Sequence, residues 1–253
     1  MLRQLAAVLA LAVPFAALAD ATVEGIKGVA RVGPEPISMG QRIPDGSDIQ
    51  TGPDSRLVLA FDDGGKMVLE QNTHFRLVSF RYEAGAPAQD HAVFDILRGA
   101  LRIVTGALAR RNRELYALRT PQVTIGVRGT DFMVAVVNPT YVNVLAGQVA
   151  VSNGAGTVVF GAGSIATAAS NAALAVPISS SALPAAAGSA FQSMGTITLG
   201  AGGAAGGAVA GTAVGGTGLG VVTPVVVFGA AVAAAAGALK SDEESASATT
   251  HHH

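Results

Sequence analysis

The sequence has no cysteine among its 253 residues, and a long part of it has no charge. Without cysteine the chain can form no disulfide and no thiolate metal site, so its folded part depends on a hydrophobic core. No Asp, Glu, Lys or Arg occurs from Phe132 to Leu239. Over the whole chain 16 Lys and Arg stand against 17 Asp and Glu. Nothing in this balance indicates a basic surface for nucleic acid, and we expect no nucleic-acid partner.

The first 19 residues have the composition of a leader for export. Arg3 supplies a positive charge, an apolar stretch runs from Leu5 to Phe15, and small residues end the segment at Ala19. This pattern predicts a secretory signal peptide over residues 1–19. The apolar stretch is shorter than the roughly 20 residues that span a bilayer, which argues against the alternative of an uncleaved anchor. We therefore expect an exported protein of the periplasm or cell envelope.

Residues 20–170 carry the signals of β-strands. Short β-branched and apolar runs follow one another between Gly, Pro, Asp and Asn, and no stretch of helical periodicity is long enough to compete. Apolar residues alternate at Leu57, Leu59 and Phe61, and again over residues 123–127, as in antiparallel sheets with one face on a core. The pattern predicts an all-β domain closed as an antiparallel β-sandwich or jelly-roll.

Glycine marks three places in this domain where the chain is expected to reverse. Residues 62–65, 98–99 and 146–147 each contain glycine between two apolar runs. Because glycine reaches positive φ at little cost, each place is predicted to be a hairpin turn.

After residue 170 the composition changes to Ala, Gly and Ser. Residues 171–198 read as a linker with little to bury, and residues 199–239 are predicted to be a small-residue segment and transmembrane helix. Residues 221–239 are uncharged and close to the length of a span. A membrane hairpin and a tether in water stay open as alternatives, and residues 240–253 form a polar tail. The glycines that could form a helix-packing face, and so a homo-oligomer contact, recur every four residues: Gly203, Gly207, Gly211 and Gly215.

Catalytic and metal-binding patterns are sparse. His74 and His91 stand outside any motif, and surface positions explain both. Asp62 and Asp63 form a carboxylate pair in a glycine turn, where Asp is favoured because it bonds local backbone amides. We therefore predict no catalytic residue, no cofactor and no metal. A glycan-active enzyme that uses Asp62 or Asp63 is a distant alternative.

Arginines crowd one stretch of the β domain and are the candidate binding residues. Such a cluster could meet an anionic polymer or a lipid headgroup, although a solvated loop between two strands explains it equally well. The arginines are Arg98, Arg102, Arg110, Arg111, Arg113 and Arg119.

Four motifs resemble the FecR domain family of bacterial periplasmic proteins. They are Gly-x-x-Ile-x-x-Gly-x-x-Ile-x-Thr-Gly at 40–52, an Asp-Gly turn at 63–64, a closing Val-Leu-x-Gly-x-Val at 144–149, and a specific box at 120–132. The box residues are Thr120, Pro121, Gly126, Val127, Arg128, Gly129, Thr130, Asp131 and Phe132. In the members that name the family, the domain relays a signal from an outer-membrane transporter to a cytoplasmic anti-sigma segment. This chain departs from that plan, because a leader stands where the cytoplasmic segment and its helix would be.

The resemblance implies an exported FecR-like β domain. Our first expectation is a non-enzymatic envelope protein that binds an envelope protein, polysaccharide or peptidoglycan and is tethered by its C-terminal helix. The alternative is a transmembrane signal-relay regulator related to FecR-type control. Within the box, Gly126 and Gly129 are expected to form a corner between strands. Arg128 is expected to hold that corner by pairing with Asp131 or with backbone carbonyls.

Overall fold

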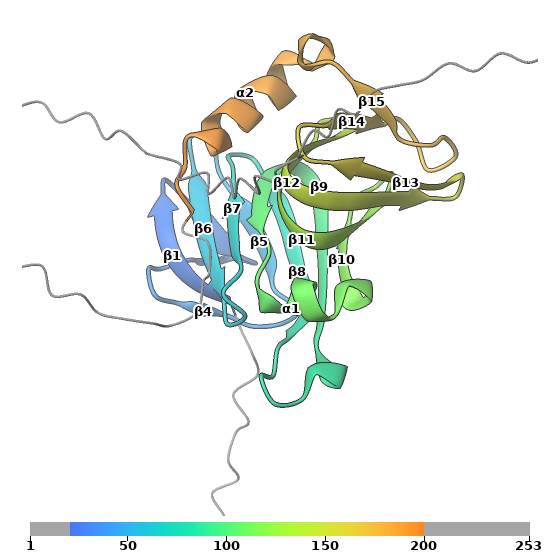
Figure 1. The fold of residues 1–253 in the computed structure, drawn as a ribbon. Helices are drawn as coiled ribbons and strands as arrows, with labels where there is room; N and C mark the ends of the chain where they lie inside the picture. Colours follow the sequence, from blue (N-terminus) through green and yellow to red (C-terminus); the bar gives the residue numbers. More distant parts are fainter. Residues whose placement is uncertain (1–20, 200–253) are drawn as a thin grey trace, which may run out of the picture. The chain divides into compact units, whose positions relative to one another are not determined.

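The computed structural model describes residues 21–199 (Figure 1). Two α-helices, α1 and α2, and three short 3₁₀ turns accompany the strands. The helical elements are α1 (Ala107–Arg111), α2 (Ala185–Gly195), η1 (Pro87–Gln89), η2 (Arg113–Leu115) and η3 (Ser180–Ala182). The strands are β1 (Ala21–Lys27), β2 (Ala30–Val32), β3 (Glu35–Pro36), β4 (Arg42–Ile43), β5 (Asp48–Thr51), β6 (Arg56–Phe61), β7 (Lys66–Leu69), β8 (His74–Arg81), β9 (His91–Val104), β10 (Tyr116–Arg119), β11 (Thr124–Val136), β12 (Thr140–Asn153), β13 (Gly156–Gly161), β14 (Ile165–Ala168) and β15 (Val176–Ile178).

The fifteen strands form one hydrogen-bonded sheet, which confirms the all-β class. Its main path runs β15-β14-β12-β11-β10-β9-β7-β6-β1-β4. The pairs are antiparallel except β9 with β10, which run parallel through a connection that contains α1. The pairing is continuous, so the strands do not separate into the two sheets expected of a sandwich.

Three long strands let one sheet wrap around a core, because each continues through a glycine. Gly99 in β9, Gly129 in β11 and Gly147 in β12 all have positive φ, and the register shifts near Gly129. The hairpins predicted at 98–99 and 146–147 are therefore wrong, since β9 and β12 bend there without reversing. The turn predicted at 62–65 is confirmed between β6 and β7.

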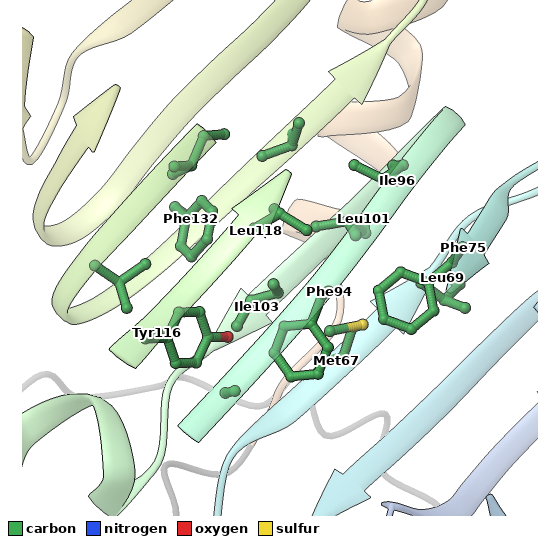
Figure 2. Packing of buried hydrophobic residues seen from close by; sticks show 14 of the residues in the cluster. Met67, Leu69, Phe75, Phe94, Ile96, Leu101, Ile103, Tyr116, Leu118 and Phe132 are labelled. Carbon is green, nitrogen blue, oxygen red and sulfur yellow. The ribbon is translucent and has the colours of Figure 1, made fainter. Parts of the chain in front are cut away.

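Alternation along the strands places the apolar side chains as predicted. Leu57, Leu59 and Phe61 are buried, and so are the apolar residues at 123, 125 and 127. Phe94 lies at the centre of an aromatic group in which its ring centroid is 5.8 Å from that of Phe75 and 5.6 Å from that of Tyr116 (Figure 2).

Residues 171–198, predicted to be a linker, instead contain β15 and α2. Helix α2 buries Ala187, Phe191 and Met194, which lie on one helical face at i, i+4 and i+7. These side chains pack with residues of β7, β9 and β11 in a second apolar cluster that includes Met133 and Ala135. The low hydrophobicity of the surrounding Ala, Gly and Ser concealed this short apolar stripe.

The remaining predicted segments lie outside the described residues. They are the leader at 1–19 and, beyond Leu199, the small-residue segment and the polar tail. Within residues 21–199 neither helix has the length and apolar character needed to cross a membrane.

Candidate functional site

Strand β11 changes its neighbour at a corner inside the box of residues 120–132. Before the corner, Ile125 pairs with Leu118 of β10; after it, Phe132 pairs with Ile103 of β9. Gly129 stands between the two parts with φ +57, a left-handed conformation that glycine adopts without steric cost. The predicted corner is confirmed, with its left-handed residue at Gly129 and not at Gly126.

A second glycine makes the corner possible from the facing strand. Gly147 of β12 also has positive φ, and a Cβ atom built there would lie 2.4 Å from the carbonyl oxygen of Gly129. No side chain can occupy that space, so the two bent strands approach through their backbones.

Arg128 does not hold this corner, and the pairing expected for it is wrong. Its side chain is exposed, and it makes no hydrogen bond or ion pair with any other residue of the described range 21–199. The reason is strand geometry, because the inward positions are taken by Val127 and, after the bulge, by Thr130. Arg128 lines a shallow groove of about 280 Å³ on the solvent face of β11, β12 and β13.

Asp131 pairs with Arg102 of β9. The Nε and Nη2 atoms of Arg102 donate to the two carboxylate oxygens of Asp131 at 2.9 and 2.7 Å, a bidentate geometry. Its remaining Nη1 donates to the carbonyl oxygens of Met194 and Ile197, each at 2.9 Å. Arg102 is only 9% exposed. One side chain therefore connects the box to the C-terminal end of α2 and the turn that follows it, where carbonyl groups carry partial negative charge.

A cavity of about 340 Å³ lies beside this connection. Arg110 of α1, Gly129, Thr130 and Asp131 contribute to its wall, and Leu199 closes it from the chain that follows α2. Arg110 is exposed and presents a cation there. The cavity thus brings together the corner, the exposed positive charge of Arg110 and the last described residue of the chain, and we take it as the candidate functional site.

The six candidate arginines do not form one surface. Arg102 is buried as described, and Arg111 is held by the buried Asp90 carboxylate at 2.6 Å and by the ring of Tyr82 at 4.4 Å. Arg113 begins η2. Arg119 is exposed at the end of β10, and Arg98 lines a different cavity, of about 510 Å³, beside α2.

The cavity beside α2 has a mixed polar and apolar lining. The polar residues Gln71, Asn72 and Arg98 line it together with Ser189 and Ser193 of the helix, and Ala186 and Ala190 of the helix also contribute. Arg98, Arg110 and Arg119 are exposed, and Arg98 and Arg110 line separate cavities.

The carboxylates and histidines weighed for catalysis hold local structure. Asp62 is exposed and pairs with Arg42 at 3.0 Å. Asp63 is buried and accepts hydrogen bonds from the backbone N–H groups of Gly65 and Leu108; burial raises its pKa, although these two bonds oppose the rise.

The histidines have equally local partners. His74 Nε2 lies 2.8 Å from an Asp48 carboxylate oxygen, and His91 Nδ1 lies 3.0 Å from the Gln89 carbonyl oxygen. Burial would raise the pKa of Asp48, but hydrogen bonds from His74 and Gln50 and nearby positive charge hold it below its usual value. No group of three or more metal-ligating side chains occurs in the part of the chain that the structure describes.

Comparison with known proteins identifies the domain that contains the corner. The family model described as FecR protein matches residues 47–150. Two crystal structures of a "putative anti-sigma factor" from Parabacteroides distasonis ATCC 8503 are similar to this chain, with TM-scores of 0.42 and 0.41 and identities of 17% and 16%. Each alignment covers 52% of this chain and 58% of the other. No curated protein matches the sequence.

Sequence reasoning found the corner but missed Arg102 as its partner. Arg102 and Asp131 are separated by 29 residues, and no local pattern relates them. The FecR match contains both residues, whereas α2 lies beyond its end.

Proposed function

Because residues 47–150 of this chain form a FecR domain, we propose that the protein is a FecR-type regulator of the bacterial envelope. The domain receives a signal as a bound partner or ligand, and the C-terminal part of the chain carries the output. The FecR match is the observation that carries the proposal. It favours a regulator over our first expectation, a binding scaffold without a regulatory role.

The Arg102 connection suggests how the signal leaves the domain. Arg102 contacts the box through Asp131 and the end of α2 through Met194 and Ile197. A ligand in the corner cavity would touch Arg110, Asp131 and Leu199 together. Its binding energy would therefore act on the position of α2 relative to β9 and β11, and through Leu199 on the segment that follows.

The location of the protein belongs to the same proposal. The leader-like composition of residues 1–19 supports a location of the FecR-like domain outside the cytoplasm, and the uncharged residues 221–239 would carry the chain through the membrane once. Residues 240–253 would then lie in the cytoplasm, where a partner could read the output.

Gene deletion tests the regulatory role. Loss of the protein should change the transcript levels of a defined set of genes, and the wild-type gene should restore them. Arg102→Lys keeps a cation but cannot reproduce the bidentate pair and both carbonyl contacts, so it should restore the transcripts poorly at equal protein level. Arg119→Lys, at an exposed arginine, is the matched control. A deletion that leaves transcript levels unchanged under every envelope stress tested would contradict regulation.

Cysteine labelling tests the route of the output. The natural chain has no cysteine, so Ser241→Cys reports one position. An impermeant maleimide should label it only after the cells are opened, whereas Ser152→Cys on β12 should react once the outer membrane is permeable. Labelling of both positions from outside would place the tail on the exported side and exclude a cytoplasmic partner.

A further inference from the structure

Four strands of the described sheet have a single hydrogen-bonded neighbour strand. They are β3, β4, β13 and β15, and each presents one free backbone edge within residues 21–199. A free edge can pair with a strand of another molecule, and natural sheets normally block it with proline, charge or a covering segment.

Three of these edges carry such a block. β3 consists of Glu35 and Pro36, β4 contains Arg42, and β15 contains Pro177. Proline removes the N–H group that a new strand would need, and a charged side chain resists burial.

β13 has neither device. Its sequence, Gly-Thr-Val-Val-Phe-Gly, contains no charge and no proline. Phe160 points into the core and is buried, whereas Val159 points outward and is 60% exposed. The strand also has high β propensity. An exposed, apolar and unblocked edge of this kind indicates an interaction surface.

The surface next to the edge is flat. Across the sheet Val159 is in register with Ala150 of β12, and Ala150 with Gly126 of β11. These small side chains form the floor of the groove of about 280 Å³ that Val159 borders. At these positions the face of the sheet beside β13 carries only small side chains.

We propose that β13 is a homodimer interface, in which it pairs antiparallel with β13 of a second copy of this chain. Charge selects this occupant. No charged residue occurs in β13 or elsewhere from Phe132 to the end of the described chain. The groove beside the edge carries one acid and one base, Glu114 and Arg128, so this surface has no net charge that would select a charged peptide. A second copy brings an edge that is equally neutral and equally apolar, so no like charges meet. In a dimer with a two-fold axis, the same surface of each copy forms the interface.

Strand geometry restricts the register of the pair. Residues directly opposite each other must point to the same face, and the exposed valines are covered when Val159 lies opposite its own copy. Val158 then lies opposite Phe160 of the second copy on the core side. The Cα atoms of directly opposed residues in antiparallel strands are about 4.5–5.5 Å apart, within the range of about 4.4–6.8 Å that a disulfide spans.

A single cysteine tests this register. The full chain with Val159→Cys, purified in mild detergent, should form a disulfide-linked dimer on mild oxidation and return to monomer on reduction. Val176→Cys is the matched control, because Val176 is 50% exposed on the proline-blocked edge β15, and it should crosslink at least tenfold more slowly. Equal rates for the two variants would overturn the proposal.

A charge at the same position tests the association itself. Val159→Lys places two ammonium groups opposite each other, and it should weaken the wild-type dimer at least tenfold in sedimentation or light scattering, whereas Val176→Lys should not. Thermal melting of both variants checks that the fold is intact. A wild-type chain that stays monomeric at about 100 μM, or an oligomer insensitive to Val159→Lys, would overturn the β13 interface. The second result would place the association elsewhere, for instance in residues 200–239.

Discussion

Residues 21–131 and residues 132–199 share one sheet but are stabilised in different ways. The first region has many ion pairs, among them Arg56 with Glu70 and Arg111 with Asp90. The second region has no charged side chain. Backbone pairing, apolar packing and a few amide or hydroxyl bonds hold it, such as those from Asn153 to the carbonyls of residues 170 and 173. Charged side chains are therefore not needed to form strands in this fold. In the first region, the contribution of each charged residue can be tested by substitution.

Polar side-chain links between the α2 segment and the charged region involve two arginines and one glutamate. Arg102 donates to the backbone carbonyls of Met194 and Ile197, and Arg56 donates to the Ser193 hydroxyl of α2. That hydroxyl in turn donates to a carboxylate oxygen of Glu70 at 3.1 Å. The end of a helix is suited to the Arg102 bonds because its last carbonyls carry partial negative charge.

Among the substitutions proposed here, removal of the Arg102 side-chain bonds should lower the free energy of unfolding most. Arg102→Leu leaves Asp131 without its cation and removes the guanidinium bonds to the carbonyls of Met194 and Ile197, and the free energy of unfolding should fall by about 3–5 kcal/mol. Denaturant unfolding measures it, and hydrogen exchange should show α2 losing protection. Arg119→Leu, at an exposed arginine, should change stability by less than about 0.5 kcal/mol. A loss below about 1 kcal/mol for Arg102→Leu would show that the uncharged region docks through apolar packing alone.

The next largest loss of stability is expected from a side chain added at Gly147, where β12 closely approaches the corner. Gly147→Ala combines an unfavourable positive φ with a Cβ atom 2.4 Å from the Gly129 oxygen, and should cost about 3 kcal/mol. Gly163→Ala has a similar φ, but nothing lies within 4 Å of the added atom, and it should cost about 1 kcal/mol. The difference between the two melting curves isolates the contact. Equal losses would mean that the strands can separate at the corner without cost.

Two threonines in the charged region should respond in opposite directions. Thr105 Oγ1 accepts from the Thr130 N–H at 2.8 Å and donates to the Thr130 carbonyl at 3.1 Å, so Thr105→Val should cost about 2 kcal/mol. Thr130 Oγ1 is buried and has no hydrogen-bond partner within residues 21–199. Thr130→Val should therefore leave stability unchanged or raise it by up to about 1 kcal/mol. A loss for Thr130→Val larger than that for Thr105→Val would contradict this assignment.

The smallest expected effect is a pH dependence that the charged region alone supplies. Burial raises the pKa of Asp63 above the usual value of 3.8, so the native state binds this proton more tightly than the unfolded state. Its contribution is present below pH 3.8 and is lost as pH rises through the raised pKa. The stability of wild type relative to Asp63→Asn should therefore decline from about pH 3 to neutral pH.

The pH dependence of wild type must be compared with that of Asp63→Asn, because Asp48 changes stability with pH in the opposite direction to Asp63. Its pKa is lowered, so its contribution is present above pH 3.8 and is lost on acidification. Both proteins keep Asp48, and the difference between their denaturation curves cancels it. Parallel stability profiles of the two proteins would contradict the raised pKa of Asp63.

The strands could be predicted from the sequence because alternation is a local signal. Leu57, Leu59 and Phe61 are buried as their spacing indicates. A bend within a strand could not be distinguished from a hairpin turn in the same way. Gly99 and Gly147 each lie between two apolar runs, which is also the sequence pattern of a glycine in a hairpin turn. Whether the chain reverses there depends on the partner strands, and these come from other parts of the sequence.

The candidate site was predicted only where its residues are adjacent in sequence. The box located the corner, but Arg128, which belongs to it, is exposed, and Arg102, which lies outside it, is the residue that bonds to Asp131. A spacing of 95 residues between Arg102 and Ile197 leaves no trace in composition or periodicity. The signal available for α2 was the i, i+4, i+7 spacing of Ala187, Phe191 and Met194, hidden among small residues.

Strand β9 has a consequence for how the chain folds. It pairs with β7, β8, β10 and β11, with the change of partners near Gly99. Two of these strands precede it and two follow it, so β9 cannot be fully paired until the chain has emerged to Val136. Closing loops of this length is slow. The domain should therefore fold late, after the chain is available as far as β11, and substitutions in β9 that weaken pairing with β11 should slow folding more than they speed unfolding.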